Sequence, residues 1–186
     1  VLPNTPEARY LNALVNDQVK RLYDWLRGQT ELTLFHFTGE TPEDKAAADK
    51  VGEEVWDACR FRTREQARGL QDAHGRRTEH GPTPDIVVTN YSMLEYMLSR
   101  PQDEVFFGQN LRVIVLDEAH LYAGTLAAEM TLLLRRLVAR CGRRSEDVLC
   151  LASSATIGSG EAGELARFGA ALFSREEADV APVQGK

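Results

Sequence analysis

Residues 113–120 constrain the fold of this chain more than any other segment. They read Val-Ile-Val-Leu-Asp-Glu-Ala-His, an uninterrupted apolar run that ends in two adjacent carboxylates. Four aliphatic residues in a row predict a strand that is buried on both faces, as in parallel sheets covered by helices. Because ligands of open α/β sheets bind beyond the carboxyl ends of the strands, the sequence places Asp117 and Glu118 where a ligand would lie.

This pair of carboxylates has two interpretations. In the first, it is a Walker B element: Asp117 holds Mg²⁺ bridged to nucleotide phosphates, because a hard cation takes oxygen ligands and keeps several waters. Glu118 then orients or deprotonates an attacking water. In the second, the two carboxylates cap the helix that follows, since they accept bonds from free amides and favour the helix dipole. The pair alone does not decide between these readings.

Composition limits the classes of protein to which the chain can belong. Its 186 residues, 43% of them hydrophobic, suffice for one domain with a full core. No segment approaches the roughly 18 consecutive apolar residues of a membrane span, and the first residues do not resemble an export signal, so we expect a cytoplasmic protein. The scattered Cys59, Cys141 and Cys150 argue against a disulfide framework and a zinc site. A net charge of -6 indicates that any contact with nucleic acid is local.

Apolar spacing predicts strands that alternate with helices. The expected helices cover residues 11–26, 93–98, 126–138 and 165–172, and the expected strands cover residues 33–37, 86–89, 113–116 and 148–152. Trp25 and Trp56 are expected to be buried or half-buried anchors. Residues from about 40 to 84 form a charged insertion, with helical turns near 46–59 and 64–70 and a loop over 74–84. The pattern predicts an α/β fold with a mostly parallel sheet flanked by helices.

Polar residues also follow the other predicted strands. Thr89 and Asn90 end one strand, Ser153, Ser154 and Thr156 end another, and Asn12 lies near the start of the first helix. Together with Asp-Glu-Ala-His, these segments resemble the ordered motifs of superfamily 2 DEAD/DEAH-box helicases. The matching segments are residues 12–18 for motif Ia, Thr89 and Asn90 for motif Ib, residues 117–120 for motif II and residues 154–156 for motif III. Bacterial DEAD/DEAH-box helicase-like proteins look most similar, through residues 12–18, 38–43 and 89–95.

The resemblance implies a partial RecA-like domain of the P-loop NTPase type, which uses ATP and Mg²⁺. Asp117 would hold Mg²⁺, Glu118 would polarise the hydrolytic water, and His120 would couple hydrolysis to movement. The resemblance also implies a coupling segment that relays the nucleotide state, namely Ser154, Ala155 and Thr156. It implies contacts with the phosphates of single-stranded DNA or RNA from Asn12, Thr89 and Asn90.

Each of these roles has a simpler alternative. Ser154 and Thr156 can form a polar turn with a helix cap, and Thr89-Asn90 can cap the helix that begins near Ser92. Tyr91 and Tyr96 can stack on bases, although aromatic residues at such positions more often pack in a core.

Two parts that the resemblance implies are absent from these 186 residues. The chain has no Gly-x-x-x-x-Gly-Lys-Ser/Thr loop and no strand before it, and it has no second RecA-like domain with an arginine finger. We therefore expect a fragment of a helicase or translocase, either truncated or the product of a fragmentary gene, that alone hydrolyses no ATP. A non-catalytic nucleic-acid-binding or scaffold module, and a translocase of a restriction or defence system that never separates strands, remain open alternatives.

Overall fold

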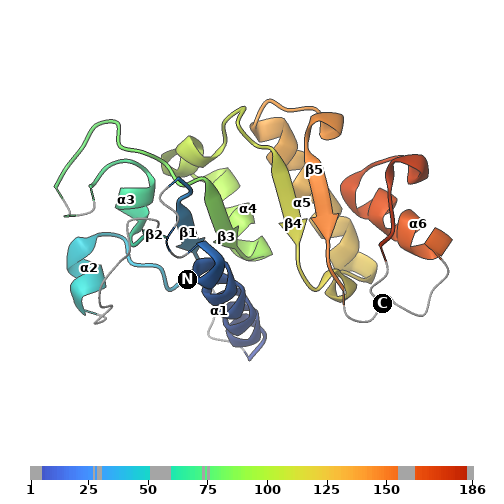
Figure 1. The fold of residues 1–186 in the computed structure, drawn as a ribbon, viewed down its shortest axis with the longest axis horizontal. Coiled ribbons are helices and arrows are strands. Elements are labelled where there is room, and N and C mark those ends of the chain that lie inside the picture. Colours follow the sequence, from blue (N-terminus) through green and yellow to red (C-terminus); the bar gives the residue numbers. More distant parts are fainter. Residues whose placement is uncertain are drawn as a thin grey trace. The chain divides into compact units, whose positions relative to one another are not determined.

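The strands that form sheets in this protein are parallel to one another. The computed structural model describes residues 6–26, 28, 31–50, 60–72, 74, 76–154 and 162–183. The chain divides into unit 1, Val1–Phe106, and unit 2, Phe107–Lys186 (Figure 1). Unit 1 has a sheet of order β2-β1-β3 and unit 2 pairs β4 with β5. The α/β class and the parallel strands, consistent with a partial RecA-like domain, are confirmed, whereas the expectation of one domain stays a prediction.

Each helix and strand predicted from apolar spacing is present. Unit 1 contains α1 (Pro6–Leu26), β1 (Leu34–Phe37), α2 (Lys45–Lys50), β2 (Arg60–Phe61), α3 (Arg64–Ala67), β3 (Ile86–Thr89), α4 (Tyr91–Ser99) and the 3₁₀ helix η1 (Pro101–Phe106). Unit 2 contains β4 (Val113–Leu116), η2 (Ala119–Leu121), α5 (Gly124–Arg140), η3 (Ser145–Asp147), β5 (Leu149–Ala152), α6 (Ala162–Phe173) and η5 (Glu177–Asp179).

The core of unit 1 is built around the central strand β1. Leu34 packs with Leu26 of α1 on one face of the sheet. On the other face, Phe35 and Phe37 each lie 5.9 Å from the ring of Phe106 in η1, measured between ring centroids. The side chains of Leu34, Phe35 and Phe37 are fully buried, and each such burial contributes about 1.5–3 kcal/mol to stability. The ends of β1 are therefore held in place by a well-packed core.

Helix α1 turns only one stripe of residues toward this core. Val19 and Leu26 are buried, but Trp25 is 72% exposed, so the expectation that it is an anchor is wrong. One residue corresponds to about 100° around a helix, which places Trp25 off the stripe that contains Leu26. The helix ends before Gly28, whose φ of +89° suits a glycine at a helix terminus. Trp56 lies outside the described residues.

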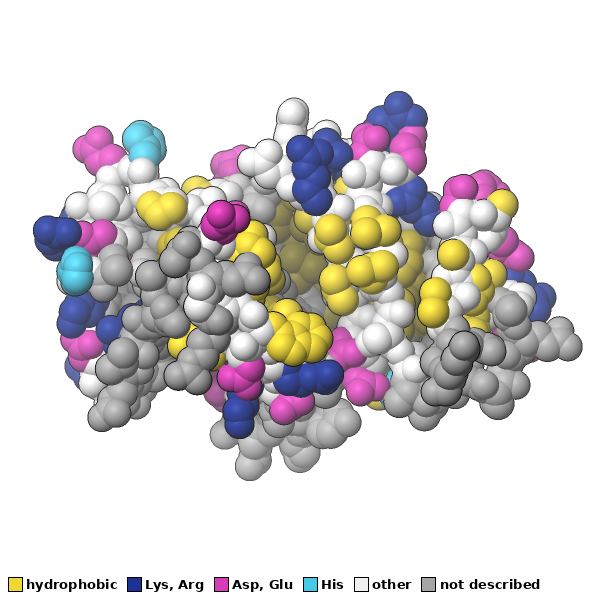
Figure 2. All heavy atoms as spheres, in the orientation of Figure 1, with side chains coloured by type: hydrophobic (Ala, Val, Ile, Leu, Met, Phe, Trp, Pro, Cys, Tyr) yellow, Lys and Arg dark blue, Asp and Glu magenta, His cyan; other side chains and the backbone are white. Residues whose placement is uncertain are grey.

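The sheet of unit 2 is covered on one face by helices of the same unit. Ile114 is buried, whereas Val113 and Val115 are 46% and 64% exposed. These two valines pair with Leu149 and Leu151 of β5, and Figure 2 shows hydrophobic side chains gathered over β4 and β5. The prediction that β4 is buried on both faces is wrong. Alternate side chains point to opposite faces of a strand, and only the face that bears Ile114 packs against α5 and α6.

The charged insertion adds an edge strand that the sequence did not predict. Strand β2 pairs with β1 through Leu34↔Arg60 and Phe35↔Phe61, although no apolar run marks it. The predicted helical turns are present as α2 and α3, while residues 51–59 lie outside the described part. Behind α3, the Arg68 Nε donates to the Oδ1 of fully buried Asp103 at 2.7 Å. This pair attaches the insertion to η1.

Candidate functional site

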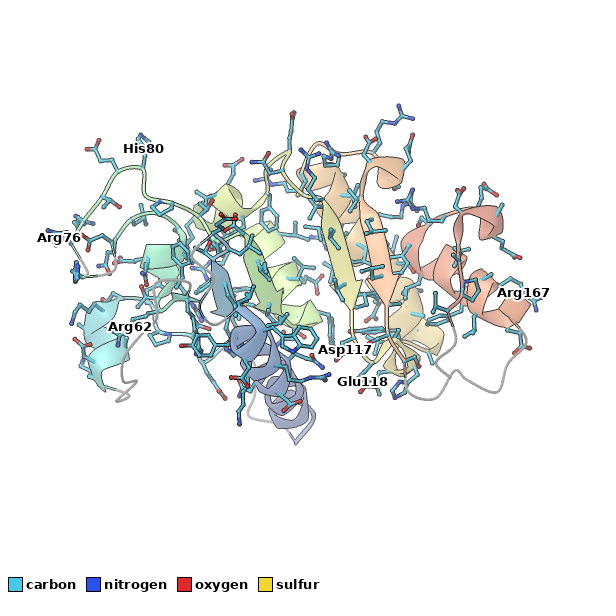
Figure 3. The ribbon with its side chains drawn as sticks, in the orientation of Figure 1. Arg62, Arg76, His80, Asp117, Glu118 and Arg167 are labelled. Carbon is cyan, nitrogen blue, oxygen red and sulfur yellow. The ribbon has the colours of Figure 1, made fainter. Side chains whose placement is uncertain are left out.

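Asp117 and Glu118 lie directly beyond the carboxyl end of β4 (Figure 3). Leu116 pairs with Ala152, and the two chains continue together past that pair: Ser153 N donates to Leu116 O at 2.9 Å, and Ala119 N donates to Ser153 O at 2.8 Å. The Ser153 hydroxyl donates to Asp117 Oδ1. The carboxylate of Asp117 is therefore oriented by the end of the neighbouring strand.

The backbone of Glu118 has an unusual conformation. Its φ of 50° and ψ of 44° lie in the left-handed region, which costs a residue with a side chain about 1–2 kcal/mol. Glu118 precedes η2 but makes no side-chain capping bond there, and α5 begins behind Ala123, also without a side-chain cap. The helix-cap interpretation therefore fails for Glu118. Its left-handed backbone turns the chain sharply, so the chain no longer continues in the direction of β4.

His120 brings motif II and the end of β5 together. Its Nδ1 lies 3.3 Å from Ser154 Oγ and 3.2 Å from Glu118 Oε2. When Nδ1 carries a hydrogen the ring donates to the carboxylate, and when it does not, it accepts from the serine hydroxyl. The contact links Glu118 to Ser154, so a change of partner at one residue alters the bonding of the other.

A second edge of polar residues is present in unit 1, where β1 and β3 end. Phe37 pairs with Thr89, and the Thr89 hydroxyl donates to Phe37 O at 2.7 Å. Asn90 Oδ1 accepts from Met93 N at 2.8 Å and caps α4. The helix-cap interpretation therefore holds for Asn90, and the amino-terminal amides of α4 lie at this edge of the sheet, where the positive end of the helix dipole favours anions.

Comparison with known proteins assigns the chain to a family. The profile of the family described as DEAD/DEAH box helicase matches residues 11–164, most of the chain. The chain belongs to this family. It is also similar to Druantia protein DruE of Escherichia coli (strain UMEA 4076-1), with 46% identity over 91 residues, which are 44% of this chain and 5% of that protein. The matched part is thus a small share of that protein's length, and no solved structure matches the chain.

DEAD/DEAH box helicases use ATP and Mg²⁺, and the residues around Asp117 fit this metal. Among the described residues, no group of three or more His, Cys, Asp or Glu side chains gathers into a cation cage. Mg²⁺ does not require such a cage, because it binds through one or two carboxylates together with waters and phosphate oxygens. Half-buried Asp117, oriented by the hydroxyl of Ser153, supplies one such carboxylate.

Three of the predicted site residues lie, entirely or through their side chains, outside the residues that the structure describes. Ala155 and Thr156 lie outside the described residues. Asn12 lies in α1, but its side chain is not described. Their roles in coupling and in nucleic-acid contact stay predictions, as do those of Asp117 and Glu118.

Two residues that shape these edges were given no role in the sequence analysis, although Ser153 was noted there as a polar residue after a strand. Ser153, one residue before the predicted motif III, is the side chain that bonds Asp117. The parallel register of Leu116 with Ala152 could have identified it, because the next residue on each strand is again a neighbour. Arg64 of the insertion is the other: its guanidinium bonds the turn after β1. No sequence signal marks Arg64. It begins α3, and the strand before it, β2, has only two residues and therefore no recognisable apolar pattern.

Burial shifts the pKa of several groups in the two units. Desolvation, with Arg60 nearby, lowers the pKa of His36 in β1 to about 4. Burial lowers the pKa of the Arg64 guanidinium, an effect that Glu43 opposes. Burial also raises the pKa of the Cys141 and Cys150 thiols, which are buried and half-buried, while Cys59 lies outside the described residues. His36 is therefore neutral at physiological pH.

Two predictions about side-chain environment have clear outcomes. Tyr96 is 51% exposed and its ring lies 4.7 Å from the Arg100 guanidinium carbon, so the core interpretation is wrong for it. Tyr91 is half-buried.

Within the described part of the chain, no helix is both long and apolar enough to cross a membrane.

Proposed function

We propose that this helicase-family chain is part of an ATP-dependent nucleic-acid helicase or translocase of the cytoplasm. Asp117 holds Mg²⁺, Glu118 polarises the attacking water, and His120 passes the state of the nucleotide on to the rest of the motor. The observation that carries the proposal is the hydroxyl-supported carboxylate at two parallel strand ends, where Ser153 bonds Asp117 and His120 contacts both Glu118 and Ser154.

The coupling role belongs to residues 154–156, which follow β5 and Ser153. The first of them, Ser154, already contacts His120 across the two strand ends. A hydroxyl can change partner at little steric cost, which suits a relay between the nucleotide and the rest of the motor. Ala155 and Thr156 complete this segment in the proposal.

The second part of the proposal concerns single-stranded DNA or RNA. Phosphates would bind at the carboxyl edge of the unit 1 sheet, at the amino terminus of α4 and at Asn90, with Asn12 as a further contact. The Thr89 hydroxyl donates its hydrogen to Phe37 O, so Thr89 would act by fixing the strand ends rather than by donating to a phosphate. A net charge of -6 also favours such local contacts over bulk attraction.

These 186 residues contain no Gly-x-x-x-x-Gly-Lys-Ser/Thr sequence, so we predict that the polypeptide by itself hydrolyses no ATP. Hydrolysis would require the phosphate-binding loop and a second RecA-like domain from the full-length protein. The rival candidate is a nucleic-acid-binding or scaffold module with a helicase fold but no turnover.

Phosphate release by the full-length protein, measured with and without single-stranded DNA and RNA, tests the proposal. We expect turnover that nucleic acid stimulates and that Glu118→Gln removes. Filter binding with and without Mg-ATP distinguishes the two candidates. The affinity of a motor for nucleic acid changes when nucleotide binds, whereas the affinity of a scaffold does not. Binding that ignores nucleotide, together with no turnover in the full-length protein, would refute the motor.

A further inference from the structure

The turn after β1 has an unusual arrangement of backbone carbonyls. Thr38 is buried, with 1% of its surface exposed, and Gly39 follows at the surface. Four consecutive carbonyls, those of residues 36–39, accept hydrogen bonds from side chains. The donors are Thr41 Oγ1 to His36 O at 2.9 Å, Thr89 Oγ1 to Phe37 O at 2.7 Å, and Arg64 Nη2 to Thr38 O at 3.0 Å and Gly39 O at 3.4 Å. These bonds direct the oxygens of the turn into the protein.

The inward carbonyls fix the direction of the amides. In a trans peptide the C=O and N–H point in opposite directions, so the Gly39 N–H points away from Arg64. A Cβ built on Gly39 would meet nothing within 4 Å, which means that the turn borders open space. Without Arg64, Gly39 O would lose its side-chain donor and Thr38 O would keep only the bond from Thr41 N, at 3.3 Å, so the peptide groups of the turn could rotate.

The turn belongs to the same edge as Asn90. Phe37 and Thr89 are paired in register, so Thr38 and Asn90 leave adjacent strands, about 4.8 Å apart, at their carboxyl ends. An anionic strand that contacts the start of α4 would pass the turn. Outward carbonyl oxygens would repel it, whereas the outward N–H of Gly39 would attract it; the neighbouring N–H groups of Thr38 and Glu40 donate to Thr41 Oγ1 and Thr38 Oγ1 within the turn.

Arg64 is poorly placed to bind a phosphate itself. Its side chain is 14% exposed, and Nη1 lies 3.4 Å from Glu43 Oε2. The guanidinium carbon lies 5.0 Å from the centre of the Phe37 ring. The backbone of Arg64 is also held, since its N–H donates to Pro42 O at 3.0 Å. Any effect of Arg64 on a ligand therefore acts through the turn.

We infer that Arg64, supplied by the charged insertion, is a positioning residue that orients the Thr38–Gly39 turn for single-stranded nucleic acid. This inference rests on the nucleic-acid role proposed for the edge. It gives the insertion a function: β2 pairs with β1 and leads into α3, whose first residue, Arg64, reaches the carbonyls of the turn beside the edge that contains Asn90.

The test is a binding titration of the 186-residue chain with fluorescent oligo(dT) and oligo(U), over a range of salt concentrations. Arg64→Gln should weaken binding by roughly three- to ten-fold, the effect of a lost hydrogen bond. The slope of log K against log[salt] should stay unchanged, because amides neutralise no phosphate charge. A direct phosphate contact would instead reduce that slope by about 0.7.

Matched variants control for charge and for folding. Arg76→Gln removes the same charge from the loop between α3 and β3, where Arg76 pairs only locally with Asp72 (Figure 3), and should leave affinity unchanged. Arg64→Lys keeps the charge but not the planar fork, so its affinity should be intermediate. Thr41→Val removes the bonds to Thr38 N and His36 O without a change of charge, and should also weaken binding. Circular dichroism checks that each variant folds. If Arg64→Gln does not fold, the affinity of Thr41→Val tests the inference in its place.

The outcomes separate the inference from the function on which it rests. A wild-type chain that binds neither oligonucleotide at low salt would refute the nucleic-acid role of the edge and the inference with it. A wild-type chain that binds would leave the role standing. In that case, unchanged affinity in Arg64→Gln, a reduced salt slope in Arg64→Gln, or full affinity in Arg64→Lys would overturn the inference alone.

Discussion

The two strand-end edges of this chain share an architecture and differ in chemistry. In unit 1, hydroxyls, the Asn90 amide and the guanidinium of Arg64 lie at the ends of β1 and β3. The backbone carbonyls there accept hydrogen bonds from side chains. In unit 2, the ends of β4 and β5 carry Asp117 and Glu118, with serine hydroxyls beside them. The first edge offers hydrogen-bond donors to an anion, and the second offers carboxylate oxygens to a cation.

The difference suggests the proposal that the same parallel-strand architecture, present in both sheets, serves a different ligand in each. A parallel register brings the residues after each strand side by side, so the residue types there determine the ligand. The framework supplies the location, and a few side chains supply the charge. Variants that change one edge should therefore alter one kind of binding and leave the other intact.

The largest effect is expected at the acidic edge. Glu118→Gln in the full-length protein should lower ATP turnover by roughly 10²- to 10⁴-fold, because it removes the group that polarises the water. Phosphate release measures this effect, and ATP binding should persist. Glu129→Gln, an exposed position on α5, is the matched control. If Glu118→Gln kept more than about a tenth of the wild-type turnover, the acidic edge would not be the site of hydrolysis.

The next effect concerns how the insertion is held beside the unit 1 edge. Asp103→Asn should lower the free energy of unfolding by about 3–5 kcal/mol, because it leaves Arg68 buried without a main partner. Urea unfolding measures the change. Glu79→Gln removes an exposed carboxylate from the same insertion and should have almost no effect. Equal stabilities of the two variants would mean that the buried pair does not anchor the insertion.

A comparable effect should depend on pH through His36. Its pKa of about 4 in the folded chain lies below the ordinary histidine value of 6.5, so the unfolded chain binds the proton more readily between these values. Stability is complete above this window and falls by about 3 kcal/mol as the pH drops through it. Urea unfolding at several pH values should show this slope. His36→Gln should flatten it and His80→Gln should not; identical slopes in all three proteins would contradict the assignment.

The smallest effect should come from Ser153. Ser153→Ala removes the hydroxyl that orients Asp117, so the Mg²⁺ concentration for half-maximal turnover in the full-length protein should rise about ten-fold. Ser99→Ala, which removes an exposed hydroxyl in α4, is the control. An unchanged Mg²⁺ requirement in Ser153→Ala would show that Asp117 needs no support from β5.

Sequence alone predicted the regular elements because apolar spacing reports which face of a helix or strand is buried. It placed the acidic pair after β4 and the polar pair after β3. It could not predict β2 and Arg64, since a strand of two residues in a charged segment has no periodicity. It was wrong about Val113 and Val115 because an apolar run does not reveal whether one or two faces are covered. The bond from Ser153 to Asp117 required the register of two strands.

The division of labour between the edges can be measured directly in one experiment. Nucleic-acid-stimulated ATP turnover of the full-length protein is followed in Asp117→Asn and Asn90→Ala as the concentration of single-stranded nucleic acid is raised. Asp117→Asn should lose turnover at every concentration. Asn90→Ala should keep the maximal rate and need more nucleic acid to reach half of it. A normal maximal rate in Asp117→Asn, or the same parameter altered in both variants, would contradict the separate roles of the two edges.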